Sequence, residues 1–191
     1  EIDRIISAVD RSKAEGQRNR AILETLYSCG LRVSELVNLK LSDLYFDEGF
    51  IKVEGKGSKQ RLVPISPRAI NEIKLYFTDR NRIEVKKEYE DFVFVSQRRG
   101  KGLSRIMIFH MIKELAQTAG IIKNISPHTF RHSFATHLLE GGANLRAIQC
   151  MLGHESIATT EIYTHIDRNM LRSEIIEHHP RNIKYRKEKE R

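Results

Sequence analysis

Apolar residues recur at helical spacing along most of the chain, in short segments separated by capping residues and glycines. The first two segments are centred on Ile5 and Leu23, and Gly30 follows where a helix often ends in a left-handed residue. A short helix over about 33–38 comes next. Later helices are expected to open at Ser66, Ser104, Ser126, Asn144, Ser156 and Asp167 and, where an end is marked, to stop near Asn81, Gly120, Gly141, Gly153 and Pro180.

A different pattern occupies residues 44–65, where short β-rich runs alternate with two turns that contain glycine. The runs cover 44–46, 50–53 and 61–65, and their spacing predicts a small three-stranded antiparallel sheet. A further apolar run at 92–95 is typical of either a short strand or a buried connector. The sequence therefore predicts an α+β fold that is mainly α, with one small sheet, in a single domain over residues 1–180.

The charge of the chain adds an expected partner. The 191 residues carry a formal net charge of +8 and have a pI of about 9.6, which favours an anionic partner such as nucleic acid. Residues 181–191 hold six basic and two acidic residues, so half of the excess charge lies at this end. Such a segment is typical of a solvated, disordered basic tail.

Composition excludes several classes of protein. No apolar run approaches the roughly 20 residues of a membrane helix, and the chain shows no signal-peptide pattern. It begins at Glu1 inside an amphipathic pattern, which is typical of a fragment of a longer protein. Cys29 and Cys150 lie among apolar helical neighbours, which favours buried, reduced thiols and a cytoplasmic protein without a membrane partner.

Basic residues that can bind one phosphate are grouped near predicted helix ends. Arg32 and Arg131 each offer a planar, permanently charged fork to two phosphate oxygens. His128 precedes Arg131 by three residues, so both lie on one helix face near its N-terminal end, where anions are favoured. Lys56, in a glycine-flanked turn, is a candidate general acid. Because no Asp/Glu cluster at metal-ligand spacing accompanies them, these residues predict phosphoryl transfer without a metal or another cofactor.

Tyr163 is the candidate nucleophile, and His154 is a candidate phosphate ligand. A phenol has a pKa of about 10, so it needs cationic neighbours or a base to attack at neutral pH. Each residue alone has a plainer explanation, since a tyrosine on an amphipathic helix usually only packs and a Gly-Lys-Gly turn is usually only a hairpin. His128 and His132 resemble a zinc pair, but no third ligand accompanies them.

Taken together, the six residues resemble those of the tyrosine site-specific recombinases, the lambda-integrase family, and most of all its Xer-type branch. The resemblance covers nearly all of residues 1–180. The motifs that carry it are Gly30–Leu36, Gly55–Pro64, Ser126–His137, Leu152–His154 and Ile162–His165.

The resemblance implies a role for each residue. Arg32 and Arg131 would bind the scissile phosphate, with His128 and His154 assisting. Lys56 would protonate the leaving 5′-hydroxyl. Tyr163 would form a 3′-phosphotyrosyl link. Glu35 matches an acidic position that helps to hold the first arginine, whereas on physical grounds alone it is only an i,i+3 surface pair.

The resemblance also implies partners. These are double-stranded DNA recombination sites, a homo- or hetero-tetramer of recombinase protomers on that DNA, and an accessory DNA translocase or directionality factor. The expected setting is chromosome-dimer resolution or mobile-element integration and excision, in the cytoplasm at the nucleoid. The family's N-terminal DNA-clamping domain has no counterpart in these residues. The last helix, about 168–177, either packs within the chain or docks on a neighbouring protomer.

Two other functions fit the same residues. A type IB topoisomerase uses the same chemistry to relax supercoils as a monomer. A non-catalytic DNA-binding module would use the arginines only to position phosphates, and its tyrosine would only pack.

Overall fold

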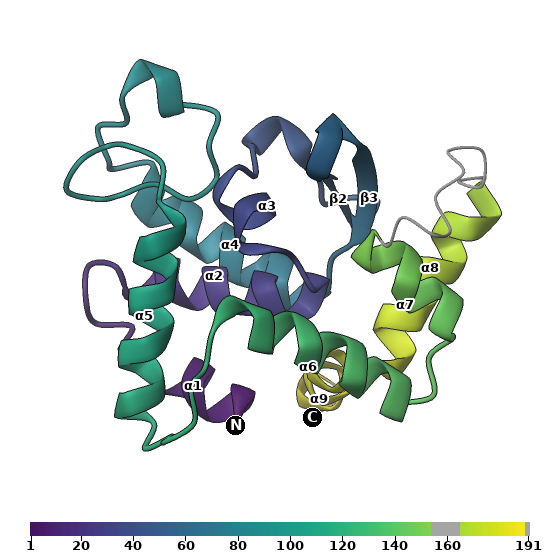
Figure 1. Cartoon of the computed structure of the whole chain (residues 1–191). Coiled ribbons are helices and arrows are strands. Elements are labelled where there is room, and N and C mark those ends of the chain that lie inside the picture. The colour runs from purple at the N-terminus through teal and green to yellow at the C-terminus, as the bar shows by residue number, and fades with distance from the viewer. Residues whose placement is uncertain (154–164, 190–191) are drawn as a thin grey trace.

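The computed structural model describes residues 1–153 and 165–189, which form a mainly helical body with one small sheet at its edge (Figure 1). The helices are α1 (Ile2–Ser7), α2 (Gly16–Cys29), α3 (Val33–Val37), α4 (Pro67–Arg80), α5 (Arg105–Thr118), α6 (Pro127–Glu140), α7 (Leu145–Leu152), α8 (His165–His178) and α9 (Pro180–Lys189). In Figure 1, α5 stands at one side of the molecule and α7 and α8 stand at the other, with α6 running between them.

The sheet has three antiparallel strands, β1 (Leu44–Tyr45), β2 (Phe50–Glu54) and β3 (Gln60–Pro64), in the order β1-β2-β3. Residues 56–58 form a 3-10 turn between β2 and β3, in which Gly57 adopts a left-handed φ of 72°. The predicted α+β class, mainly α with one small antiparallel sheet, is confirmed. The 92–95 run is a buried connector with isolated bridge pairings at its two ends.

The helix ends follow the predicted capping signals. The side chains of Ser66, Ser104 and Asn144 accept hydrogen bonds from backbone N–H groups in the first turns of α4, α5 and α7. Gly30 and Gly153 end α2 and α7 with left-handed φ angles of 61° and 69°. Arg131 donates to the carbonyl of Gly30 and to that of Leu152, the residue before Gly153.

Two clusters of buried apolar side chains form the core, and α6 joins them. The larger cluster draws on α1 to α5 and the sheet and takes Phe130 from α6; the smaller one lies among α6, α7 and α8 and takes Phe134. Phe130 and Phe134 are one helical turn apart, so Arg131 lies where the two clusters meet. Cys29 is buried in the larger cluster, and burial raises the pKa of its thiol.

Two expectations for α8 can be compared with the structure. The helix already includes His165, so Asp167 is not its N-cap; Asp is common both as a cap and within the first turn, and the sequence does not distinguish the two. Leu171 and Ile175 are 5% and 1% exposed and pack in the smaller cluster, so their apolar side chains are used within the chain.

The expectation of a disordered tail from residue 181 is wrong for residues 181–189, which are helical in α9. Arg181 is buried and donates from Nε to Oε2 of Glu24 in α2 at 3.1 Å, and from Nη1 to Asp3 at 3.0 Å. Asn182 is also buried and donates to the carbonyl of Ile175. A charge count along the tail missed these contacts because the partners lie far away in the sequence. Across 1–153 and 165–189, no helix is long and apolar enough to cross a membrane.

His179, between α8 and α9, is fully buried and is bonded as a neutral imidazole. Its Nδ1 accepts the backbone N–H of Arg181 at 3.3 Å, and its Nε2 lies 3.3 Å from the carbonyl oxygen of Tyr27, to which it donates. Burial lowers the pKa of His179 to about 3. The neighbouring His137 and Arg181 act in the same direction, while the Tyr27 hydrogen bond and the Asp3 charge oppose them.

We expect His179 to make the protein less stable as the pH falls. Above pH 6.5 the imidazole is neutral in both states; below it, the unfolded chain takes up a proton that the folded chain does not bind. The resulting loss in the free energy of unfolding is about 2 kcal/mol between pH 7 and pH 5. Urea unfolding of the wild type and of His179→Gln at both pH values measures it. Equal losses in the two proteins would contradict the assignment.

Candidate active site

Arg32 lies at the start of α3, where its extended backbone makes it the N-cap residue. Its backbone N–H donates to Oε2 of Glu35 at 2.9 Å, and its Nη1 donates to Oε1 at 3.0 Å. The Arg32 side chain is 39% exposed, whereas that of Glu35 is 1% exposed. Glu35 is therefore not the surface pair that i,i+3 spacing alone suggests but a buried carboxylate that holds Arg32 at the surface.

Arg131 lies in the second turn of α6 and connects two helix ends. Its Nη1 donates to the carbonyl oxygen of Gly30 after α2, and its Nη2 donates to that of Leu152 at the end of α7, both at 2.6 Å. The last carbonyls of a helix lack partners within the helix and carry partial negative charge, so a guanidinium is well matched to both. Each terminal nitrogen keeps a second N–H for another acceptor.

Arg61 of β3 is the third guanidinium at this place. It forms a two-point ion pair with Glu35, Nη1 to Oε1 at 2.6 Å and Nη2 to Oε2 at 3.1 Å, and its Nε donates to the carbonyl of Met151 at 2.9 Å. The sequence motif over 55–64 contains Arg61 but does not by itself indicate a role for it. An arginine within an otherwise apolar strand was the available signal, since such a residue is rarely buried without a charged partner.

The cluster of Arg32, Arg61, Arg131 and Glu35 has more positive than negative charge. Burial opposes ionisation of Glu35, but the hydrogen bond and charge of Arg61, together with Arg32, hold its pKa below the usual value. Burial, and then the charge of Arg32, lower the pKa of Arg131 to about 10, so it remains a cation at neutral pH. Three guanidiniums around one carboxylate can accept an additional anion.

His128 is exposed in the first turn of α6, three residues before Arg131, as its spacing predicted. His132 is exposed one turn later, with its Nε2 3.5 Å from the hydroxyl of Thr136. No group of three or more His, Cys, Asp or Glu side chains within the described ranges is arranged to hold a metal ion. The N–H groups at the N-terminal end of α6, together with the guanidinium of Arg131, favour the binding of an anion beside His128.

For Lys56, His154 and Tyr163, the structure describes residues nearby in the sequence but not the side chains themselves. Lys56 begins the turn between β2 and β3, and its side chain lies outside the described atoms. His154 and Tyr163 lie outside the described residues. His154 is the residue after Gly153, and the carbonyls of the two residues before that glycine are bound by Arg61 and Arg131.

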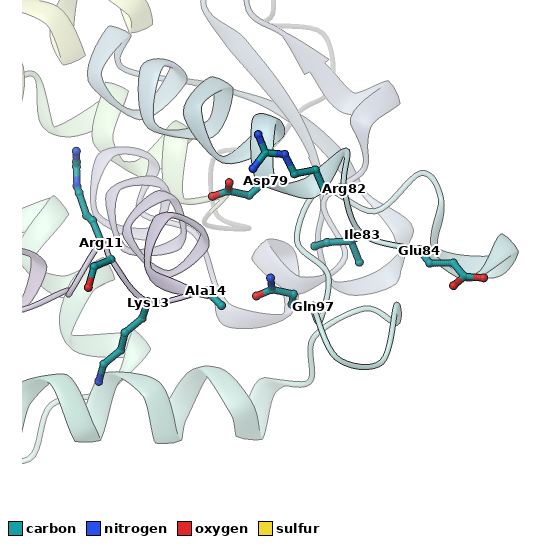
Figure 2. Close-up of a pocket in the computed structure, with 9 residues that line it drawn as sticks. Arg11, Lys13, Ala14, Asp79, Arg82, Ile83, Glu84 and Gln97 are labelled. Carbon is teal, nitrogen blue, oxygen red and sulfur yellow. The ribbon is translucent and has the colours of Figure 1, made fainter.

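A separate polar pocket of about 330 Å³ lies between residues 11–14, the end of α4 and Gln97 (Figure 2). Lys13 and Arg82 line it together with Asp79 and Glu84, so its charges are mixed. Arg32, His128 and Arg131, the candidates whose side chains the structure describes, do not line it. The arginine cluster is instead open to the surface through Arg32, which suits a ligand as large as a nucleic-acid backbone.

Comparison with known proteins identifies a family for this chain. The model of the phage integrase family matches residues 1–170. The tyrosine recombinase XerD of Pseudomonas putida is 45% identical over 181 residues, which cover 95% of this chain and 60% of that protein. The chain thus spans less than two thirds of the length of this relative.

Solved structures give the same result. The crystal structure of XerA recombinase matches with a TM-score of 0.71 and 37% identity, over 94% of this chain and 63% of that one. The post-cleavage complex of XerH site-specific recombinase with a palindromic difH substrate matches with a TM-score of 0.71 and 30% identity, over 92% of this chain and 50% of that one.

Proposed function

The chain belongs to the phage integrase family, whose model matches residues 1–170, and we propose that it is the catalytic part of a tyrosine site-specific recombinase. The observation that carries the proposal is the arginine cluster. Arg32 and Arg131 come from sequence positions 99 residues apart and lie together at the junction of α2, α3, α6 and α7, with Glu35 between Arg32 and Arg61. The Arg32 side chain is 39% exposed and Arg131 keeps N–H groups beyond those used within the protein, so this cluster leaves donors available for an anion.

The proposed reaction is transfer of a DNA phosphoryl group to a tyrosine. The phenol of Tyr163 gives its proton to water or a nearby base, its oxygen attacks the scissile phosphorus, the bond to the 5′-oxygen breaks, and Lys56 gives that oxygen a proton. Arg32 and Arg131 neutralise the charge that grows on the non-bridging oxygens. The tyrosyl phosphodiester keeps the energy of the broken bond, so a 5′-hydroxyl can rejoin the strand without ATP.

The histidines would assist at the phosphate. His128, exposed at the N-terminal end of α6 three residues before Arg131, would donate to a phosphate oxygen that Arg131 also binds. His154, the residue after Gly153 in the sequence, would also donate to the phosphate. Both then act as hydrogen-bond donors rather than as metal ligands.

The biological substrate would be a pair of double-stranded recombination sites held by a tetramer of recombinase protomers. XerH site-specific recombinase, a similar protein, is bound to a palindromic difH substrate in its post-cleavage complex, which supports a DNA site as the substrate. Chromosome-dimer resolution and mobile-element integration use the same chemistry, and an accessory translocase or directionality factor would distinguish them.

A suicide substrate tests the proposal. Nicked duplexes from a pool of varied sites lose a short 5′ strand after cleavage, so a covalent protein–DNA adduct accumulates on a denaturing gel. We expect an adduct in the presence of EDTA that is absent in Tyr163→Phe and unchanged in Tyr185→Phe, a tyrosine of α9. An adduct that persists in Tyr163→Phe would contradict the assignment of the nucleophile.

The same assay separates the rival functions. Relaxation of supercoiled plasmids of any sequence by the wild type would favour a type IB topoisomerase. Retarded DNA in a native gel without any adduct would favour a non-catalytic DNA-binding module.

A further inference from the structure

We propose that Arg61 is a positioning residue for the DNA cleavage proposed above: it fixes Glu35, and through Glu35 Arg32, against the end of α7. The inference rests on the proposed function. It is carried by the contacts of one side chain, which joins β3 to α3 on one side and to α7 on the other.

Arg61 does not have the exposure of a phosphate ligand. Its side chain is only 8% exposed, and its Nε, Nη1 and Nη2 all donate to acceptors within the protein. Arg32, which shares Glu35 with it, has a side chain that is 39% exposed. The two arginines on one carboxylate therefore differ in role, with Arg61 facing inward and Arg32 facing the surface.

The two-point pairing decides what Arg32 can do. Arg61 contacts both oxygens of Glu35, while Arg32 uses one side-chain N–H, from Nη1, together with its backbone N–H. Most of the Arg32 guanidinium is thereby left for an anion. Without Arg61, Arg32 would be the remaining partner of the Glu35 carboxylate. Because a buried carboxylate needs a close counter-ion, the Arg32 guanidinium would be drawn inward, away from a phosphate.

Arg61 also fixes the point where the chain leaves α7. Its Nε binds the carbonyl of Met151, and Arg131 binds the next carbonyl, that of Leu152. A Cβ added to Gly153 would lie 3.1 Å from three atoms of the Arg61 side chain, so the backbone crosses directly over this guanidinium. The two arginines thus bind the carbonyls three and two residues before His154 in the sequence.

The first test replaces Arg61 by methionine, which keeps much of the length and loses the charge and the donors. Adduct formation is expected to slow about 100-fold, comparable to the loss of one preorganised donor to the transition state. Arg61→Lys keeps the charge but not the fork, so it should recover part of the rate. Single-turnover rates at saturating protein measure both, well below each melting temperature.

A double-mutant cycle separates positioning from general damage. In the Arg32→Ala background the residue that Arg61 holds through Glu35 is already gone. In that background, Arg61→Met should slow the reaction about 10-fold or less. This smaller effect would come from loss of the hydrogen bond between Arg61 and the carbonyl of Met151. The same factor of about 100 in both backgrounds would overturn the proposal.

Arg68→Met is the matched control. Arg68 of α4 is likewise a part-buried arginine, 16% exposed in its side chain. Its ion-pair partners are Glu24, 3.2 Å from its Nε, and Glu188, and neither belongs to the arginine cluster. The control is expected to lower the melting temperature and to leave the adduct rate unchanged. Equal slowing by Arg68→Met and Arg61→Met would show that loss of a buried ion pair alone explains the effect and would overturn the proposal.

Hydrogen exchange gives a readout that does not depend on catalysis. The amide of Arg32 donates to Glu35, so Arg61→Met should speed exchange at that amide and in the last turn of α7, and Arg68→Met should not. Unchanged exchange overturns the positioning role even if the protein cleaves DNA. If the wild type forms no adduct but the exchange pattern is as expected, the proposed function is overturned. The role of Arg61 in holding Glu35 and the end of α7 would still be supported.

Discussion

Replacing Arg131 by lysine is expected to slow formation of the covalent adduct about 100- to 1,000-fold. Arginine spans the carbonyls of Gly30 and Leu152 with its two terminal nitrogens, both at 2.6 Å, and still has N–H groups for a phosphate. Lysine keeps the charge but has one nitrogen, so it cannot bridge both helix ends and offer a fork to the substrate. The measurement is the single-turnover rate on the nicked duplex at saturating protein.

Arg80→Lys is the control for this change. Arg80 at the end of α4 is 8% exposed and also donates to backbone carbonyls, those of Glu90, Phe92 and Val93, away from the candidate site. Its replacement should lower the melting temperature and leave the adduct rate as in the wild type. If Arg131→Lys reacts as fast as Arg80→Lys, then Arg131 is a structural bridge and not a ligand of the transition state.

The helices could be predicted from the sequence because the signals that start and end them are local. The hydroxyl of Ser66 accepts the N–H of Ala69 three residues later, and Asn144 caps α7 through Arg146 and Ala147. Such bonds depend on nearby residues alone, so a capping residue next to an apolar period places these helices. A residue such as Asp167, which is common both as a cap and in the first turn, does not fix the start of α8.

The roles of Glu35 and Arg61 could not be predicted in this way. Arg61 contacts Glu35 across 26 positions and Met151 across 90 positions. Periodicity indicates which face of an element is buried, but it does not say which distant element covers that face. The candidate cluster around Arg32 and Arg131 was found from motif spacing, whereas the inward-facing arginine that supports it becomes visible only once β3, α3 and α7 are placed together.

The same limit explains the wrong expectation for residues 181–189. Counting charges along a segment treats each of them as solvated. Arg181, however, is 5% exposed because Glu24, 157 positions earlier, lies fully buried on α2 and accepts from it. Burial works against the charge of this arginine, but the hydrogen bond and charge of Glu24 raise its pKa above the ordinary value. The packing of α9 against α2 therefore depends on the carboxylate of Glu24.

Replacing Glu24 by alanine is accordingly expected to lower the free energy of unfolding by about 3–5 kcal/mol. The carboxylate is shared by Arg181, by Arg68 at 3.2 Å and by Arg20 at 3.4 Å, so its removal leaves partly buried guanidiniums facing one another without their counter-ion. Urea unfolding at pH 7 measures the loss. Hydrogen exchange should at the same time become faster along α9 than in α4, since α9 loses its main anchor while α4 keeps its apolar contacts.

Glu188→Ala is the matched change at the surface. Glu188 is the other carboxylate partner of Arg68, at 3.5 Å, but its side chain is 65% exposed. An exposed ion pair contributes at most about 1 kcal/mol, so this variant should unfold close to the wild type. If both glutamate variants lose the same small amount, the buried position of Glu24 contributes nothing beyond an ordinary surface pair. In that case α9 would be held by its apolar side chains rather than by Arg181.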